Sequence, residues 1–338
     1  MRIAASAFAL PRPLCIPPLL MAAALWSMPA PAQEVLALGG LQRTDDGGET
    51  SYGYTYSYQH NLAEHWFASF SYLNEGHVTN HHRDGHSVQI WWRYPFGDRH
   101  FNVAIGAGPY RYFDTTDRNA DGNSDNHHGW GVLASVAATW YVNGGPWMLQ
   151  ARYNRAQTPS SIKTNTLLLG VGYQLDRGDR GGPVVPAPSR TGNVTQNEIT
   201  VFLGQTIVNT FGSETSFAKA IEYRSGLARY VSGTVSYINE GESSALRRNG
   251  LAGQLWLERA FLGDALTLGV GAGPYYAIDL SERGRTAPQD TSRWSGLLTM
   301  SASYRFSQRW VGRLSWNRTV TGYDRDTDIF MAGLGYRF

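Results

Sequence analysis

The segment Ser51-Tyr52-Gly53-Tyr54-Thr55-Tyr56-Ser57-Tyr58 has a tyrosine at every second position, with small residues between. Alternation with a period of two puts successive side chains on opposite faces of an extended chain, so it predicts a β-strand with one apolar face. The same alternation recurs along the chain, for example in 266–273 and 330–338. We count eight such strands in each half, from 34–42 to 164–175 and from 198–209 to 327–338. The predicted fold class is all-β, with antiparallel strands.

The two halves of the chain repeat one another. Ser71-Tyr72-Leu73-Asn74-Glu75-Gly76 returns as Ser236-Tyr237-Ile238-Asn239-Glu240-Gly241, and Gly106-Ala107-Gly108-Pro109-Tyr110 returns unchanged from Gly271. The offset from Gly106 to Gly271 is 165 residues, far longer than a solenoid repeat and close to the length of a domain. The chain is therefore predicted to be a tandem duplication of an eight-stranded unit, with one copy in 33–175 and the other in 197–338.

The first 32 residues have the features of a cleavable export signal. Arg2 and Arg12 carry positive charge, 14–26 is mostly apolar, and Ala30-Pro31-Ala32 offers a small-x-small cleavage site. Cys15 is the only cysteine and lies within this segment, so we expect neither disulfides nor cysteine catalysis in the mature chain. The formal net charge of +2 argues against a nucleic-acid partner, and no later apolar run is long enough for a transmembrane helix.

The connections between the predicted strands alternate in length. The tight turns are 61–64, 97–99, 143–146, 225–228, 262–264 and 307–308, and the longer polar connections include 76–84, 115–128 and 281–291. Short turns on one side and longer loops on the other are typical of bacterial outer-membrane β-barrels, in which closure of the sheet satisfies every backbone group that lipid cannot. We expect tryptophans near strand ends to form interfacial girdles: Trp66, Trp91, Trp92, Trp140, Trp147, Trp256, Trp310 and Trp316. A soluble β-sandwich is the alternative.

The chain ends in alternating apolar residues and the aromatic Phe338. This ending resembles the terminal signal of bacterial outer-membrane β-barrel proteins, and the resemblance implies insertion by the barrel assembly machinery into the outer membrane of a Gram-negative cell. Each half is similar in size and loop plan to the small eight-stranded barrels. The last four strands most resemble the lipid A 3-O-deacylase family.

That family has a His-x-Ser motif on its seventh strand, with histidine as base and serine as nucleophile. The matching segments here read Asn154-Arg155-Ala156 and Asn317-Arg318-Thr319. Asparagine cannot accept a proton near neutral pH, so the resemblance does not extend to the motif. We assign no catalytic residue and expect that the chain is not a deacylase.

The segment 176–196 contains three prolines and four glycines and is predicted to be a periplasmic linker. Its length is unnecessary if strand eight simply turns back into strand nine. We therefore predict two closed eight-stranded barrels, with one sixteen-stranded barrel as the alternative. Eight strands leave an interior filled by side chains, whereas sixteen leave an aqueous channel.

Both halves carry the same set of polar residues, most of them near the longer connections. The set is Asn74, Glu75, Arg83, Asp114, Asn154, Arg155, Asn239, Glu240, Arg248, Asp279, Asn317 and Arg318. One interpretation is a duplicated ligand site for a saccharide, a lipid headgroup or an ion. The other, which we favour, is a network of paired charges that fills and stiffens each barrel, because buried charges must be paired and hydrogen-bonded.

Two further candidate sites occur only in the first half. Asp117, Asn119, Asp121 and Asp125, with Gly122, reproduce part of the spacing of a calcium-binding loop, although His128 occupies the position of the expected glutamate. No cofactor is required by this interpretation, and Ca²⁺ at 117–125 is a hypothesis beside an ordinary polar loop. All nine histidines precede residue 130, and six are expected on two neighbouring loops where they could bind a transition metal: His77, His81, His82, His86, His127 and His128.

The sequence supports three functional hypotheses. The first is a non-enzymatic outer-membrane barrel that binds, scaffolds or assists export of a cell-surface component. The second is a sixteen-stranded diffusion porin, and the third is a lipid A-modifying enzyme with an unrecognised catalytic set. The expected partners are outer-membrane lipid, lipopolysaccharide and, through Phe338, the barrel assembly machinery.

Overall fold

A computed structural model describes residues 33–45, 47–97, 99–116, 124–175, 182–183, 197–228, 230–282 and 292–338. The predicted export signal, and all of the predicted linker except 182–183, lie outside these residues. Among the described residues, no helix has the length and apolar character needed to cross a membrane.

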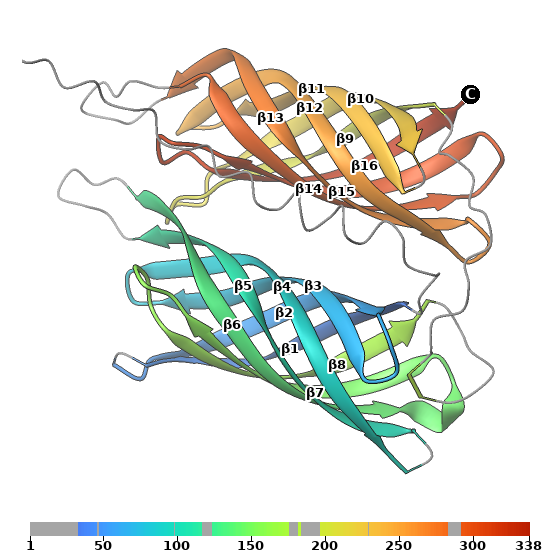
Figure 1. Cartoon of the computed structure of the whole chain (residues 1–338). Coiled ribbons are helices and arrows are strands. Elements are labelled where there is room, and N and C mark those ends of the chain that lie inside the picture. Colours follow the sequence, from blue (N-terminus) through green and yellow to red (C-terminus); the bar gives the residue numbers. More distant parts are fainter. Residues whose placement is uncertain are drawn as a thin grey trace, which may run out of the picture.

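The chain forms two closed barrels of eight antiparallel strands (Figure 1). Barrel 1 consists of β1 (Gln33–Thr44), β2 (Thr50–Asn61), β3 (Trp66–Val78), β4 (His81–Phe96), β5 (Phe101–Thr116), β6 (Asp125–Tyr141), β7 (Trp147–Gln157) and β8 (Thr164–Gln174), with a 3₁₀ turn, η1 (Val142–Gly144), between β6 and β7. Barrel 2 consists of β9 (Glu198–Val208), β10 (Thr215–Ala228), β11 (Val231–Glu242), β12 (Leu246–Phe261), β13 (Leu266–Glu282), β14 (Trp294–Arg305), β15 (Trp310–Val320) and β16 (Thr327–Arg337).

Each barrel closes on its own first and last strands. In barrel 1, β1 pairs with β8 so that Leu38 lies opposite Gly170. In barrel 2, β9 pairs with β16 so that Val201 lies opposite Leu334. The prediction of two eight-stranded units is confirmed, and the alternative of one sixteen-stranded barrel is wrong. Closure leaves no edge strand, so the backbone groups of every strand find partners within the same barrel.

Alternating side chains point into and out of each barrel, as the period of two predicted. Outward positions carry large apolar residues with high exposure, such as Leu41 at 70% and Leu169 at 67%. Exposed tryptophans near the short-turn ends of their strands form the predicted girdle: Trp66, Trp92, Trp140, Trp147 and Trp310. Trp91, Trp256 and Trp316 were wrongly expected in this girdle. Trp91 and Trp256 point inward and are buried, because they fall on the opposite phase of their strands, and Trp316 lies in the middle of β15, where it packs against Tyr72 of barrel 1.

The connections at the two barrel ends differ from the prediction in two places. The predicted long loop 76–84 is a tight hairpin, since β3 runs to Val78, β4 starts at His81, and Asn80 takes a positive φ of 62° in the turn. The predicted turn 225–228 lies inside β10. Hereafter the loop end is the end with the β1–β2, β3–β4, β5–β6 and β7–β8 connections, and their counterparts in barrel 2. In bacterial outer-membrane barrels, the end with the longer connections is extracellular.

Candidate functional site

The repeated Asn-Glu-Gly segment forms the same β-bulge in each barrel. The side-chain oxygen of Asn74 accepts a hydrogen bond from the N–H of Gly76 at 3.0 Å, and Asn239 does the same for Gly241 at 2.8 Å. Both glycines have positive φ, 69° and 81°. A Cβ at Gly76 would meet the carbonyl oxygen of Tyr52, so glycine is required there. The bulge turns the intervening glutamate into the barrel.

Each inward glutamate holds a buried arginine. Arg83 Nε donates to Glu75 Oε2 at 2.5 Å, and Arg248 Nε donates to Glu240 Oε1 at 2.7 Å. All four side chains are at most 2% exposed. A tyrosine ring lies 5.8 Å from each guanidinium carbon, from Tyr110 in barrel 1 and from Tyr275 in barrel 2. The same buried ion pair therefore occurs at the loop end of both barrels.

The remaining arginine donors bind the hairpin that closes each barrel. Arg83 donates to the hydroxyls of Thr158 at 3.2 Å, Ser161 at 3.1 Å and Thr164 at 2.8 Å, all on or near the β7–β8 connection. Arg248 donates to Tyr323 Oη at 2.9 Å and Thr327 Oγ1 at 2.7 Å around the β15–β16 connection. These donors are satisfied within the protein. The geometry is that of a structural plug at the loop end of each barrel.

The asparagines at the deacylase-like positions also point inward. Asn154 Oδ1 accepts from Ser135 Oγ at 2.8 Å, and Asn317 Oδ1 accepts from Thr299 Oγ1 at 2.9 Å. A glutamine on the fourth strand of each barrel continues this chain of hydrogen bonds, since Gln89 donates to Ser135 and Gln254 to Thr299. Both asparagines therefore join neighbouring strands inside their barrels.

Asp114 and Asp279 do not occupy equivalent sites, although the sequence repeat aligned them. Asp114 points into barrel 1, where His81 Nδ1 lies 2.8 Å from its Oδ2 and Ser161 Oγ donates to the same oxygen at 2.7 Å. Asp279 lies on the outside of barrel 2 and pairs with Arg247 at 3.1 Å. A register shift between Asn249 and Gly250 accounts for the difference.

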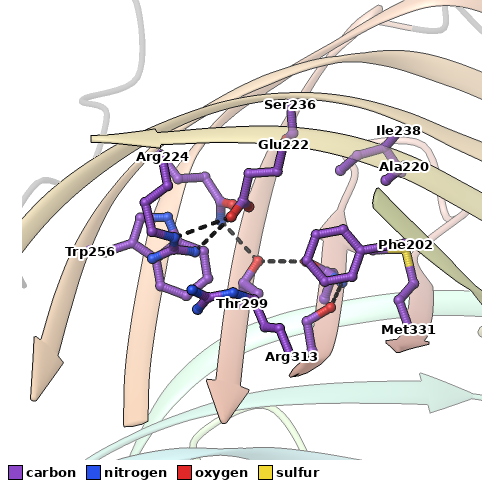
Figure 2. Close-up of a pocket in the computed structure, with 13 residues that line it drawn as sticks. Phe202, Ala220, Glu222, Arg224, Ser236, Ile238, Trp256, Thr299, Arg313 and Met331 are labelled. Carbon is purple, nitrogen blue, oxygen red and sulfur yellow. Dashed lines mark hydrogen bonds and ion pairs between the residues drawn. The ribbon is translucent and has the colours of Figure 1, made fainter. Parts of the chain in front are cut away.

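The middle of barrel 2 holds a second charged cluster around a cavity of about 10 Å³ (Figure 2). Arg224 lies 4.0 Å above the Trp256 ring and donates to Glu222 at 2.8 Å, while Arg313 donates to Glu198 at 2.9 Å. A cavity of this size holds about one water molecule. The space within this cluster therefore accommodates a water molecule and no larger ligand.

In barrel 1 an arginine also lies over the corresponding indole, that of Trp91, but this arginine comes from a different strand than in barrel 2. Arg152 on β7 lies 5.2 Å from the Trp91 ring and donates to Gln150 and Ser57, each at 2.9 Å. In barrel 2 the equivalent cation, Arg224, comes from β10. The position of the cation is shared, but the residue that supplies it is not.

The six candidate metal-binding histidines do not converge. They lie on the strands β3, β4 and β6, because the strands extend past the positions where loops were expected. His81 faces inward to Asp114, whereas His77 and His82 stack outside the barrel with ring centroids 3.9 Å apart. His127 is the third residue of β6 and lies opposite Asp114 in the backbone pairing of β5 with β6. No three His, Asp or Glu side chains in the described part of the chain are placed to hold a metal.

The calcium hypothesis falls mostly outside the described residues. Asp117, Asn119 and Asp121 belong to 117–123, which the structure does not describe, and Asp125 is the first residue of β6. Elsewhere among the loops, the N–H of Thr79 donates to Glu49 Oε2 at 2.8 Å. This hydrogen bond holds the pKa of Glu49 below its usual value.

Sequence reasoning missed the contact between the barrels. Arg318 on the outside of β15 donates through Nη2 to Asp84 Oδ2 of barrel 1 at 2.6 Å and to Asp328 Oδ2 of its own barrel at 2.6 Å. Arg318 and Asp84 are 3% and 8% exposed. Charges at outward positions of a membrane barrel are costly against lipid. The outward positions of Asp84 and Arg318 in the alternating pattern were therefore a sequence signal that these residues face protein instead of lipid.

Aromatic rings surround this ion pair. Trp316 packs edge-on against Tyr72 with centroids 4.3 Å apart and stacks on His86 at 5.5 Å. His128 Nε2 lies 2.6 Å from Asp326 Oδ2. Three histidines thus lie at the face between the barrels. His86 and His128 contact barrel 2, and His82 lies two residues before Asp84 on β4. Barrel 2 contains no histidine of its own.

The loop ends of the two barrels are also joined by hydrogen bonds. The N–H of Asn126 donates to Asp324 Oδ1 at 3.1 Å, and its Nδ2 donates to the carbonyl oxygen of Asn209 at 2.9 Å. The N–H of Asp326 returns a bond to Asn126 Oδ1 at 3.1 Å. One asparagine of barrel 1 therefore binds two connections of barrel 2.

Residues 19–174 match the family described as outer membrane protein beta-barrel domain. No curated protein sequence matches. The N-terminal β-barrel domain of Pseudomonas aeruginosa OprF is 14% identical, with a TM-score of 0.36, and the alignment covers 44% of this chain and 99% of that one.

Two other solved structures are similar at the same level. The attachment invasion locus protein Ail of Yersinia pestis, in complex with the heparin analogue sucrose octasulfate, is 14% identical over 43% of this chain and 99% of its own, with a TM-score of 0.34. Neisserial surface protein A is 13% identical over 42% of this chain and 96% of its own, with a TM-score of 0.33. The family match and the two closed barrels lead to the same conclusion: this chain is an outer-membrane β-barrel protein made of two eight-stranded units, the first of which carries the family match.

Proposed function

We propose that this protein is a non-enzymatic scaffold of the Gram-negative outer membrane that binds a cell-surface component at the extracellular ends of its two barrels. The observation that carries the proposal is the set of hydrogen bonds around Asn126. They hold the connections of barrel 1 and barrel 2 together as one composite surface. A rigid surface built from two barrels can contact a larger partner than one small barrel can.

The filled interiors support action at the outer surface. At both loop ends a buried arginine bonds to its glutamate and to the closing hairpin, and the cavity of barrel 2 has the volume of about one water molecule. A purified protein with such interiors is expected to give no steady open current in planar bilayers. Persistent single-channel currents would contradict this proposal, and they would revive a pore function without a sixteen-stranded barrel.

Lipopolysaccharide is the proposed neighbour of the outward apolar band, and Phe338 is the proposed contact with the barrel assembly machinery during insertion. The lipid A-modifying enzyme remains the competing hypothesis. Mass spectrometry of lipid A from cells with and without the protein tests it. Identical lipid A in both samples is the expected result, and a change in acylation would favour the enzyme.

The binding proposal is tested with the full protein isolated from its own outer membrane. We expect surface polysaccharide or lipopolysaccharide to co-isolate with the wild type and to be reduced several-fold with Asn126→Ala, because the composite surface loosens. Asn197→Ala is the matched control, since Asn197 lies at the opposite end, near the start of β9, and bonds to Ser225 at 2.9 Å. If the wild type and Asn126→Ala co-isolate equal amounts of polysaccharide or lipopolysaccharide, the Asn126 contacts no longer support the binding proposal.

A further inference from the structure

The contact between the two barrels joins two different faces. Barrel 1 contributes the β3–β4 face, with Tyr72, Asp84 and His86, and barrel 2 contributes the β15–β16 face, with Trp316 and Arg318. An interface between unlike faces is heterologous, and it leaves one face of each kind free. Because the chain is a duplication, the free faces can be identified. They are β7–β8 of barrel 1 and β11–β12 of barrel 2.

The free β7–β8 face repeats the arrangement of β15–β16. Arg155 lies opposite Asn165 as Arg318 lies opposite Asp328. In both cases the guanidinium bonds across the strands at 2.9 Å, from Arg155 Nη1 to Asn165 and from Arg318 Nε to Asp328. The Arg155 side chain is 43% exposed and also pairs with Asp45 at 2.8 Å. Tyr153 takes the place of Trp316 and is exposed.

The free β11–β12 face repeats the arrangement of β3–β4. Tyr237 lies opposite Leu251 as Tyr72 lies opposite His86, and both Tyr237 and Leu251 are exposed. Asn249 stands at the position of Asp84. Its Nδ2 donates at 3.3 Å to Asp279 Oδ2 on the neighbouring strand, and the Asp279 side chain is 41% exposed. The face therefore retains a carboxylate beside the position that binds arginine in barrel 1.

We propose that a second copy of this chain docks its β7–β8 face on the β11–β12 face of barrel 2. The contact within one chain is then continued between chains, and the molecules associate head-to-tail in the outer membrane. Arg155 of one copy pairs with Asp279 of the next, and Tyr153 packs against Tyr237 and Leu251. Charge complementarity and continuity with the contact inside the chain support this occupant. The neutral Asn249 in place of Asp84 makes the contact between chains weaker than the one within a chain.

Cysteine crosslinking tests this proposal in intact outer membranes. The sequence has Cys15 as its only cysteine, within the predicted export signal, so introduced pairs react without background. Tyr153→Cys combined with Leu251→Cys is expected to give a ladder of dimers, trimers and larger species on oxidation, reversed by reductant. Ala37→Cys combined with Val171→Cys is the control for reactivity. It is expected to give only an intrachain bond, because these residues lie directly opposite one another on the paired strands β1 and β8.

Charge reversal distinguishes a specific contact from random collisions in a crowded membrane. Arg155→Glu in the Tyr153→Cys, Leu251→Cys background should reduce the ladder by about tenfold, which corresponds to about 1.4 kcal/mol. Adding Asp279→Arg should restore it. The proposal would be overturned if the control pair reacts and no ladder forms. It would also be overturned if the amount of ladder is the same with and without the two charge changes.

Lipopolysaccharide is the competing occupant of the β11–β12 face, because Lys219 on β10 and Arg247 on β12 also point outward there. Native mass spectrometry of the wild type and of Lys219→Ala separates the two occupants. Dimers and larger species with unchanged lipid content support association of the chains. Stoichiometric lipopolysaccharide that is lost with Lys219→Ala, together with a monomeric protein, would assign the face to lipid and overturn the proposal.

Discussion

Arg318 of barrel 2 donates hydrogen bonds from both terminal nitrogens to the two carboxylate oxygens of Asp84 in barrel 1. The two residues are 234 positions apart in the chain and lie on the outer surfaces of different barrels. Bidentate arginine–carboxylate contacts fix orientation as well as distance. This pair therefore sets how one barrel faces the other.

Asp84→Ala is expected to loosen the contact between the two barrels without unfolding either. Removing one partner of a buried ion pair costs about 3–5 kcal/mol, and Asp328 keeps the loss near the lower end by retaining Arg318. Spin labels at Thr50→Cys and Thr215→Cys would report the distance between barrels. The narrow distance distribution of the parent should broaden. Arg155→Ala is the control, because its partly exposed pair with Asp45 contributes about 1 kcal/mol or less and lies away from the contact.

Glu75→Gln and Glu240→Gln are each expected to destabilise one barrel. Either change leaves a buried arginine without its counter-charge, which costs about 3–5 kcal/mol. Heat-modified migration in gels should show an intermediate form in which one barrel is unfolded. Glu64→Gln provides the comparison, since Glu64 is 51% exposed and its pair with Arg99 is solvated. Normal heat resistance combined with lost binding of the surface component would instead favour a ligand site at these glutamates.

Gly76→Ala should lower the stability of barrel 1 by about 1–3 kcal/mol, because the residue has a positive φ and its new methyl group would meet the carbonyl oxygen of Tyr52. Gly39→Ala is a suitable reference, because a Cβ there meets nothing within 4 Å. The midpoint of unfolding in urea with lipid vesicles measures both. Equal midpoints would show that the bulge does not depend on glycine.

Closure of each barrel can be read from cysteine pairs across the closing strands. Ala37→Cys with Val171→Cys should crosslink within barrel 1, and Val201→Cys with Leu334→Cys should crosslink within barrel 2, because each pair is in register. Ala37→Cys with Leu334→Cys joins β1 to β16 and should remain reduced. A bond in this last pair would require a single ring of sixteen strands.

The sequence predicted the strands well because the period of two follows directly from the geometry of an extended chain. The repeat then predicted two units, and the rule that buried charges are paired favoured a charge network inside each barrel without naming which residues pair. Polar residues misled the prediction at the hairpin around Asn80. They indicated a loop, but Arg83 belongs to the barrel interior and Asp84 to the contact with barrel 2.

Residues at equivalent positions could not be distinguished from sequence alone. Arg155 and Arg318 have the same place in the repeat and the same cross-strand bond, yet one is 43% exposed and the other 3%. The difference depends on which face the other barrel covers. The local sequence pattern does not encode which face is covered. The outward position of the Asp84 carboxylate on β4 was the one local indication of a covered face.

The arginine above each buried indole has a consequence for any exchange of parts between the halves. Since β7 supplies this cation in barrel 1 and β10 supplies it in barrel 2, a hybrid with β7 in place of β15 would crowd two guanidinium groups over Trp256. The reverse hybrid, with β15 in place of β7, would remove the cation from above Trp91. The two barrels therefore support the same indole with cations from different strands, and a single strand cannot be exchanged between them without a compensating change on a second strand.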